Sequence, residues 1–328
     1  MAARDLLSHQ TKGRHFGAFE RFQRLARMVL LISGVGLFSW TALAQDAGTL
    51  EPKALPPLAH PEDPSTPAKQ LFGRKDKPTS GQAKVIGFYA KGCLAGAAEL
   101  PSDGDGWQVM RPSRNRAWGY PDTIKFLQHM AHANRVAHIW PGLLVGDMAQ
   151  PRGGPMITGH ASHQIGIDAD LWLRPMPDRK LSRQEREEMP SLNVVRDDGL
   201  DVNSNWTPQH LALIRSFADQ KDVQRIFVNP AIKKAICREA QGDRHWLSKI
   251  RPEHGHNYHF HVRLACPAGQ SDCDGQNPPP PGDGCDETLA WWFKDEVLHP
   301  KLDPNWKPKP GMTLAALPKA CAAVLHAP

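Results

Sequence analysis

Gly159-His-Ala-Ser-His-Gln-Ile-Gly-Ile-Asp-Ala-Asp170 carries the strongest structural signal in this chain of 328 residues. It runs into a predicted strand, because the odd-numbered positions from Ile165 to Leu173 are all apolar. A period of two is typical of a strand that buries one face in a core. Asp168 and Asp170 occupy even positions and therefore share the opposite face. One side of the predicted sheet thus presents two carboxylates.

A second histidine-rich segment, His256-Asn-Tyr-His-Phe-His261, lies further along the chain. From His259 to Leu264 the polar and apolar side chains alternate, so a strand projects His259 and His261 from the same side. If the two strands are neighbours, two imidazoles and two carboxylates meet across them.

A metal site from these segments requires a bend in the first one. A fully extended chain would hold His163 roughly 23 Å from Asp170, far beyond a shared ion. Gly159 and Gly166 are available for turns, because glycine adopts backbone angles that other residues avoid. We expect His163 to fold back over Asp170 and, together with His261, to bind one zinc ion. Three protein ligands leave the fourth position to water, as in catalytic zinc sites.

Such a site suits the hydrolysis of an amide. Bound zinc lowers the pKa of its water to about 7 and polarises a carbonyl group. His259, two residues from His261, is our candidate for moving the proton. His256 is our candidate for orienting the water or stabilising the oxyanion. No His-Glu dipeptide and no Gly-x-Ser-x-Gly motif occurs, which excludes an H-E-x-x-H zincin and a serine elbow.

Residues 1–44 are predicted to be a secretory signal peptide. Basic residues precede an apolar run from Met28 to Phe38, and Ala42-Leu43-Ala44 fits an A-x-A cleavage site. The apolar run is too short to span a bilayer comfortably. We therefore expect an exported protein with no stable membrane span after cleavage, and a retained anchor is the alternative.

The charge balance excludes nucleic acid as a partner. Six Lys or Arg against two acidic residues give residues 1–44 a charge of +4, so only +2 of the whole chain's +6 remains after cleavage. The remaining chain also has no Lys/Arg-rich run with interleaved aromatics, which nucleic-acid binding would require.

The number of cysteines is even, and in an exported chain this predicts three disulfides. Fifteen pairings are possible, although two of the cysteines bracket a short turn that can close locally. A cysteine zinc cluster is not expected, because no C-x-x-C pair exists. The cysteines are Cys93, Cys237, Cys266, Cys273, Cys285 and Cys321. The two that bracket the short turn are Cys266 and Cys273.

Short strands and helices mix along the chain, which indicates an α+β fold. Proline-rich stretches divide it into an extended arm at 45–82, a core at 83–276 that carries the zinc site, and a tail at 277–328. Helices are predicted from Pro121 to about Ala133, from Pro208 and from Pro230, and strands at 142–146 and 223–228.

Four segments closely resemble the penicillin-insensitive murein endopeptidases: residues 159–170, Arg225-Ile-Phe-Val-Asn-Pro-Ala-Ile-Lys233, His259-Phe-His-Val-Arg263 and Gly282-Asp-Gly-Cys285. The match extends over about residues 85 to 325. The resemblance implies a periplasmic zinc metallopeptidase of the lysostaphin, D-Ala-D-Ala peptidase and Hedgehog-like group, with a small central antiparallel sheet flanked by helices. It also implies D,D-endopeptidase activity, which cuts the D-alanyl to meso-diaminopimelyl cross-link of murein.

The resemblance further implies roles for single residues. The zinc ligands match His163, Asp170 and His261, and the general base matches His259. A second metal, if bound, would involve His160, Asp198 and Asp201, although Asp198-Gly-Leu-Asp201 also fits a solvated turn. The implied disulfides are Cys93 with Cys321 and Cys237 with Cys285, which would clip the tail to the core, and Cys266 with Cys273.

Two other functions remain open. A D,D-carboxypeptidase of the same group would need a cationic group that grips a free terminal carboxylate. A murein-binding module with a structural zinc would have four protein ligands and no exchangeable water.

Overall fold

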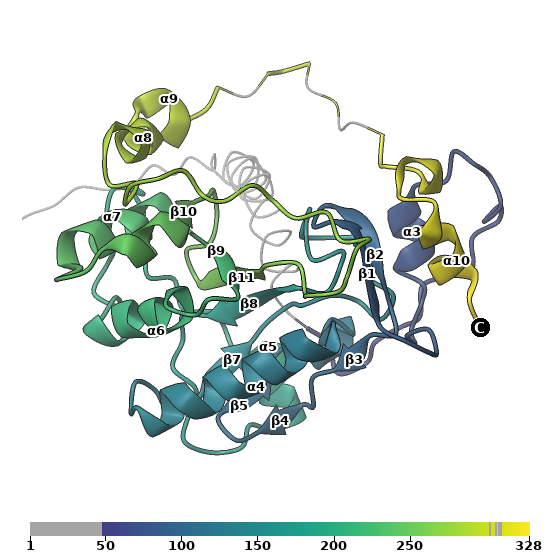
Figure 1. Ribbon diagram of the computed structural model, residues 1–328, viewed down its shortest axis with the longest axis horizontal. Helices are drawn as coiled ribbons and strands as arrows, with labels where there is room; N and C mark the ends of the chain where they lie inside the picture. The colour runs from purple at the N-terminus through teal and green to yellow at the C-terminus, as the bar shows by residue number, and fades with distance from the viewer. Residues whose placement is uncertain (1–47, 302, 306, 308–309) are drawn as a thin grey trace, which may run out of the picture. The chain divides into compact units, whose positions relative to one another are not determined.

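A computed structural model describes residues 48–301, 303–305, 307 and 310–328, so the predicted signal peptide lies outside the described residues. Contacts gather the described residues into one compact unit. At its centre lies a seven-stranded sheet with the strand order β10-β9-β11-β8-β7-β5-β4 (Figure 1). The boundaries between arm, core and tail stay predictions.

The middle of this sheet is antiparallel. Strand β11 (His259–Leu264) lies between β8 (Asp168–Trp172) and β9 (Val223–Val228) and is antiparallel to both. Strand β7 (Leu143–Val145) continues the antiparallel order beyond β8. The outer strands make the whole sheet mixed, since β10 (Ile250–Pro252) is parallel to β9 and β5 (Trp107–Val109) is parallel to β7, with β4 (Asp103–Gly104) at the edge. The α+β class is confirmed, and the expected antiparallel sheet describes its central strands only.

Helices cover the apolar face of the sheet. Helix α4 (Pro121–Val136) begins with proline at its first position and buries Ile124, Leu127 and Met130 on one stripe. Helix α6 (Pro208–Ala218) begins at a capping box, and the ring of its Phe217 lies 5.5 Å from that of Phe260 in β11. Both helices therefore contribute to the main core, on the side of β11 opposite to its histidines.

The remaining elements surround this core. The helices are α3 (Ala68–Phe72), α5 (Arg183–Glu188), α7 (Pro230–Glu239), α8 (Glu287–Ala290), α9 (Asp295–Leu298) and α10 (Ala320–His326), with short 3-10 turns at Pro112–Arg114, His245–Lys249, Trp291–Phe293 and Leu314–Ala316. The small strands are β1 (Lys84–Phe88), β2 (Lys91–Ala95), β3 (Ala98–Glu99) and β6 (Trp118–Gly119). The three predicted helices and the strands at 142–146 and 223–228 are confirmed, and α4 extends three residues past its predicted end.

The predicted strand from Ile165 to Leu173 is shorter than expected. It begins only at Asp168, because Gly166 has a φ of 73° and turns the chain just before it. The expectation of one buried face is also incomplete, since every residue of β8 is buried. Strand β8 is covered on both sides, so its polar face packs under a loop and does not face solvent.

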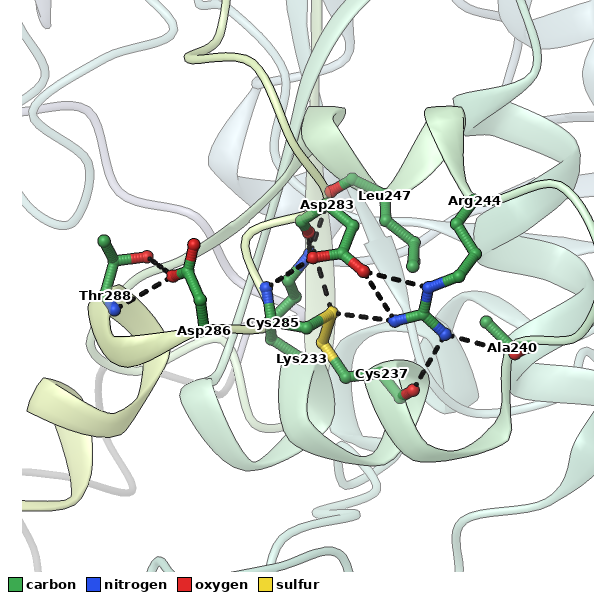
Figure 2. The surroundings of a disulfide bond; sticks show 9 residues. All are labelled: Lys233, Cys237, Ala240, Arg244, Leu247, Asp283, Cys285, Asp286 and Thr288. Carbon is green, nitrogen blue, oxygen red and sulfur yellow. Dashed lines mark hydrogen bonds and ion pairs between the residues drawn. A yellow bond between two sulfur atoms is a disulfide. The ribbon is translucent and has the colours of Figure 1, made fainter.

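The N-terminal arm is not extended throughout. Its helix α3 buries Ala68 and Phe72 in a second apolar cluster, which includes Cys93, Cys321 and Leu325. Three disulfides, Cys93–Cys321, Cys237–Cys285 and Cys266–Cys273, form the pairing that the resemblance implied. Figure 2 shows how Cys237–Cys285 joins helix α7 to the tail segment before α8.

Within the part of the chain that the structure describes, no helix has both the length and the apolar character needed to cross a membrane.

Candidate metal centre

The loop between β7 and β8 carries His160 and His163 over the sheet. Side-chain amides hold this loop: Gln150 Nε2 donates to the carbonyl of Gly153 at 2.7 Å, and Gln164 Nε2 donates to that of Ala161 at 2.9 Å. His163 itself has a φ of 66°, which is an unfavourable backbone conformation for a residue with a Cβ. Such strain persists only where the surroundings enforce it, and it is concentrated at functional sites.

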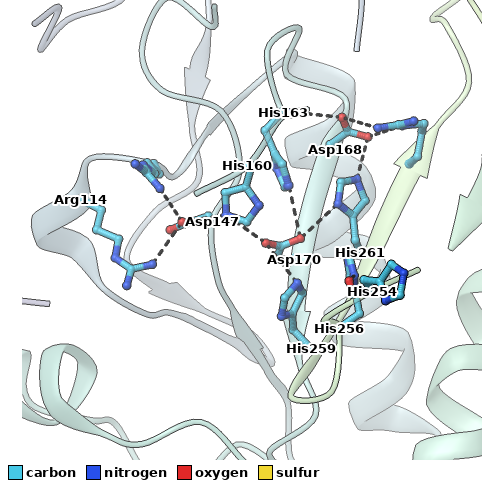
Figure 3. Close-up of polar contacts among 12 residues, drawn as sticks. Arg114, Asp147, His160, His163, Asp168, Asp170, His254, His256, His259 and His261 are labelled. Atoms are coloured by element: carbon cyan, nitrogen blue, oxygen red, sulfur yellow. Dashed lines mark hydrogen bonds and ion pairs between the residues drawn. The ribbon is translucent and has the colours of Figure 1, made fainter. Parts of the chain in front are cut away.

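Asp170 lies at the centre of the histidines (Figure 3). Its Oδ1 lies 3.3 Å from His163 Nε2 and 3.4 Å from His261 Nδ1. Its Oδ2 lies 3.5 Å from His160 Nε2 and 3.6 Å from His259 Nε2. The strand register explains part of this arrangement, because His261 is directly opposite Asp170 in the β8–β11 pair. The predicted bend and the predicted meeting of the two strands are both present.

Unpartnered polar atoms concentrate at this point. Among the described residues, five buried side-chain nitrogen or oxygen atoms have no hydrogen-bond partner, and four of them belong to His163, Asp170 and His261. Leaving a buried polar atom unpaired costs about 1–3 kcal/mol, so a cluster of them indicates a missing partner. Imidazole nitrogens and a carboxylate oxygen are the donors that zinc prefers. The residues present therefore fit a metal ion.

Distances alone single out a slightly different set, namely His160, His163 and Asp170, whose ligand atoms lie within 4.8 Å of one another. We favour His261 over His160 as the third ligand. His160 Nε2 already contacts Asp147 Oδ2 at 3.1 Å and is partly exposed, whereas His261 is buried. His261 Nδ1 also faces Asp170 directly.

Asp168 supports this site from behind. It is fully buried, its Oδ2 accepts the backbone N–H of His163 at 3.1 Å, and its Oδ1 accepts from Arg263 Nε at 2.8 Å. The same Oδ1 lies 3.1 Å from His261 Nε2. A carboxylate at that ring nitrogen holds its proton there and leaves Nδ1 free, as second-sphere carboxylates do at metal-bound histidines. Burial raises the pKa of Asp168, but the Arg263 guanidinium outweighs this effect and holds the pKa well below its usual range.

His259 and His256 lie beside the cluster. Burial lowers the pKa of His259 to about 3 in spite of the nearby Asp170 charge, so its ring is neutral. The rings of His256 and His259 are 4.9 Å apart. His256 has a φ of 52°, and its Nδ1 lies 2.9 Å from the carbonyl oxygen of His254. Because a carbonyl can only accept, that Nδ1 carries the proton and Nε2 is free to accept.

Asp147 is a site residue that the sequence reasoning missed. It is buried at the end of β7, where its Oδ2 accepts from Arg116 Nη1 at 2.8 Å and from Arg114 Nη1 at 3.2 Å as well as facing His160. Burial raises the pKa of Asp147, but His160 and the two guanidinium groups hold it well below the usual range. Its place directly after a predicted strand was the only local signal.

Most of this chain matches known proteins of one family. The family model of the penicillin-insensitive murein endopeptidases matches residues 85–326. Relatives that carry this name include proteins of Haemophilus influenzae, 44% identical over 76% of this chain and 84% of the relative, and Klebsiella pneumoniae, 43% identical over 76% and 88%. One from Yersinia enterocolitica is 42% identical over 80% of this chain and 90% of the relative.

This chain belongs to the penicillin-insensitive murein endopeptidase family. It is therefore a peptidase, and the described residues contain a group that can hold a metal ion.

The second metal that the resemblance to this endopeptidase family implied gains no support from the geometry. Asp198 pairs with Arg196 and accepts the backbone N–H of Leu200 at 3.0 Å, as in an Asx turn. Asp201 Oδ2 pairs with Arg238 Nη1 at 3.0 Å. Among the described residues, the candidate metal group includes neither carboxylate, and each of them pairs with an arginine instead.

Proposed function

We propose that this chain is a zinc-dependent D,D-endopeptidase that hydrolyses the D-alanyl to meso-diaminopimelyl cross-link of murein in the periplasm. Family membership supports the reaction class and the substrate. The observation that carries the metal is the convergence of unpartnered buried atoms from His163 and Asp170, with His261 Nδ1 facing the same Asp170 oxygen at 3.4 Å. Three disulfides support export, because such bonds persist in oxidising compartments.

In this proposal His163 Nε2, an oxygen of Asp170 and His261 Nδ1 hold the zinc ion, with Asp168 orienting two of them. Zinc bound there would supply a Lewis acid for the scissile carbonyl and would acidify the attacking water.

The proton transfers belong to His259. Its Nε2 lies 3.6 Å from Asp170 Oδ2, so it is adjacent to the ligand set. We assign it the proton that leaves the attacking water and later reaches the departing amine. His256, whose ring neighbours that of His259, assists by orienting the water or by stabilising the oxyanion.

The position of His160 allows one alternative function, a murein-binding module. As a fourth protein ligand, His160 would close the site and make the zinc structural. Its Nε2 is 3.5 Å from Asp170 Oδ2, which permits this. The closer Asp147 carboxylate, at 3.1 Å, argues for the open site. A D,D-carboxypeptidase gains less support, since Arg114 and Arg116 beside the site both bind Asp147.

The test is to incubate the purified protein with cross-linked muropeptide dimers, with chelator, without it, and with zinc restored, and to identify the products by mass. Two intact monomers that vanish with chelator and return with zinc are the expected result. Released terminal D-Ala would instead indicate a carboxypeptidase, and unchanged dimers a binding module. His160→Ala should keep its zinc under the open-site proposal, and loss of zinc in that variant would favour the closed, structural site.

A further inference from the structure

An exposed indole lies on the tail segment of the molecule. Trp291 opens the 3-10 turn Trp291–Phe293 and leaves 47% of its surface exposed, although it is one of the largest apolar side chains available. Its ring centroid is 5.3 Å from that of Trp292, with the two planes at 83°. Two adjoining aromatic rings of this kind can form a binding surface, because aromatic side chains give large contact area at low entropic cost.

The aromatic pair adjoins the candidate catalytic histidines. Trp292 packs edge to face on His254, with ring centroids 4.9 Å apart. The carbonyl of His254 contacts His256 Nδ1 at 2.9 Å, and the His256 ring neighbours that of His259. A short, continuous path of contacts therefore links Trp291 to the histidines beside Asp170.

The segment that carries these indoles is anchored firmly (Figure 2). The Cys237–Cys285 disulfide ties it to α7. Arg244 donates to Asp283 Oδ2 at 2.9 Å, and the buried Lys233 donates to the Asp283 carbonyl at 2.5 Å. Asp286 then caps α8 by accepting the N–H of Thr288 at 3.0 Å. A platform that is already ordered loses little entropy when a ligand binds.

We propose that Trp291, supported by Trp292, binds sugar rings of the murein glycan strand and so positions the cross-link at the metal centre. Murein consists of amino-sugar rings and of peptides that carry carboxylates. Sugar rings present C–H faces that pack on an indole, whereas carboxylates select cations with paired hydrogen bonds. An uncharged indole face therefore fits the glycan part of the substrate. This inference rests on the proposed endopeptidase function, since that function places murein at the site.

The test compares two soluble substrates with the same cross-linked peptide. One is a cross-linked murein fragment that keeps its glycan, and the other is the same peptide dimer after an amidase has removed the sugars. For Trp291→Ala we expect kcat/KM on the glycan-bearing fragment to fall roughly five- to tenfold, mostly through KM, because one stacking contact is lost. Cleavage of the sugar-free dimer should stay at the wild-type rate.

Two controls accompany this comparison. Trp291→Phe keeps an aromatic face and should restore most of the lost affinity. Val136→Ala removes another exposed apolar side chain, from the end of α4, and should leave the cleavage of both substrates unchanged. Equal rates of Trp291→Ala and wild type on the glycan-bearing fragment, or an equal loss on both substrates, would overturn the glycan site. If the wild-type protein cleaves neither substrate, the endopeptidase proposal itself fails, and the two failures are thus distinguishable.

Discussion

His163 and His259 both contact the carboxylate of Asp170, yet we assign them different chemical work. In our proposal His163, which has two unpartnered buried nitrogens, is a metal ligand, whereas His259 only moves the proton. His259→Ala should therefore retain zinc at one equivalent, while kcat falls by about 10²–10⁴ because a general base is removed. His163→Ala should lose both zinc and activity. Metal analysis beside dimer cleavage checks this, and a fully active His259→Ala variant would contradict the assignment.

Lys233 offers a second test at the residue scale, away from the metal centre. Its Nζ is buried between the carbonyls of Leu247 and Asp283, and burial, reinforced by Arg251, lowers the pKa of Lys233 to about 7 from the ordinary 10.5. Between these two values the unfolded chain binds a proton that the folded chain lacks. Stability from this group therefore rises as the pH rises from 7 toward 10.5, and it is lost as the pH falls from 10.5 to the folded-state pKa of about 7.

Lys233→Met removes this titration. The free energy of unfolding of the wild type minus that of the variant should increase between pH 7 and pH 9, by at most roughly 1.4 kcal/mol per pH unit. Urea unfolding at several pH values, with the disulfides intact, measures this difference. Parallel curves for the two proteins would show that Lys233 keeps an ordinary pKa.

At the scale of elements, the turn that leads into β8 decides where His163 lies. Gly166 has a φ of 73°, and a Cβ there would lie 2.4 Å from Leu94 Cδ2 and 3.0 Å from the backbone nitrogen of Tyr120. Gly242 has a similar φ of 70° but nothing within 4 Å. Gly242→Ala should lower the free energy of unfolding by about 1–2 kcal/mol, from backbone strain alone. Gly166→Ala should lower it by roughly 3 kcal/mol or more and should also weaken zinc binding. Equal losses for the two variants in denaturant unfolding would disprove the role of the clash.

The same elements show how far sequence reasoning reaches. Alternation in β8 and β11 was enough to predict which side chains share a face of each strand, because side-chain direction follows the strand period, and that Asp170 and His261 meet if the strands are neighbours, as they are. The burial of β8 on both faces was not predictable, since it depends on which loop folds over the sheet. Asp147 was missed for a similar reason: its partner Arg116 comes from the segment before β6 and His160 from the loop before β8, and no local pattern encodes those contacts.

At the scale of the whole molecule, the two Pro-rich ends hold each other against the core. Helices α3 and α10 share the apolar cluster around Cys93 and Cys321. Arg152, in the loop that precedes the site histidines, donates to the carbonyl oxygens of Val324 and Leu325 at 3.0 and 2.9 Å. Helix α10 therefore supports the same loop that positions His163. These contacts link the stability of the two ends to the order of the candidate metal centre.

The three disulfides should contribute unequally to this stability. They join cysteines 228, 48 and 7 residues apart, and a longer closed loop removes more entropy from the unfolded chain. In the chain-entropy model the losses are about 5, 4 and 2 kcal/mol. Paired Cys→Ala variants should follow this order in denaturant unfolding, with Cys93/Cys321 the most damaging because both cysteines are also fully buried. If removal of Cys266–Cys273 lowered the free energy of unfolding as much as removal of Cys93–Cys321, the closed-loop length would not explain the stabilisation by these disulfides. Local packing around the cysteines would then have to explain it.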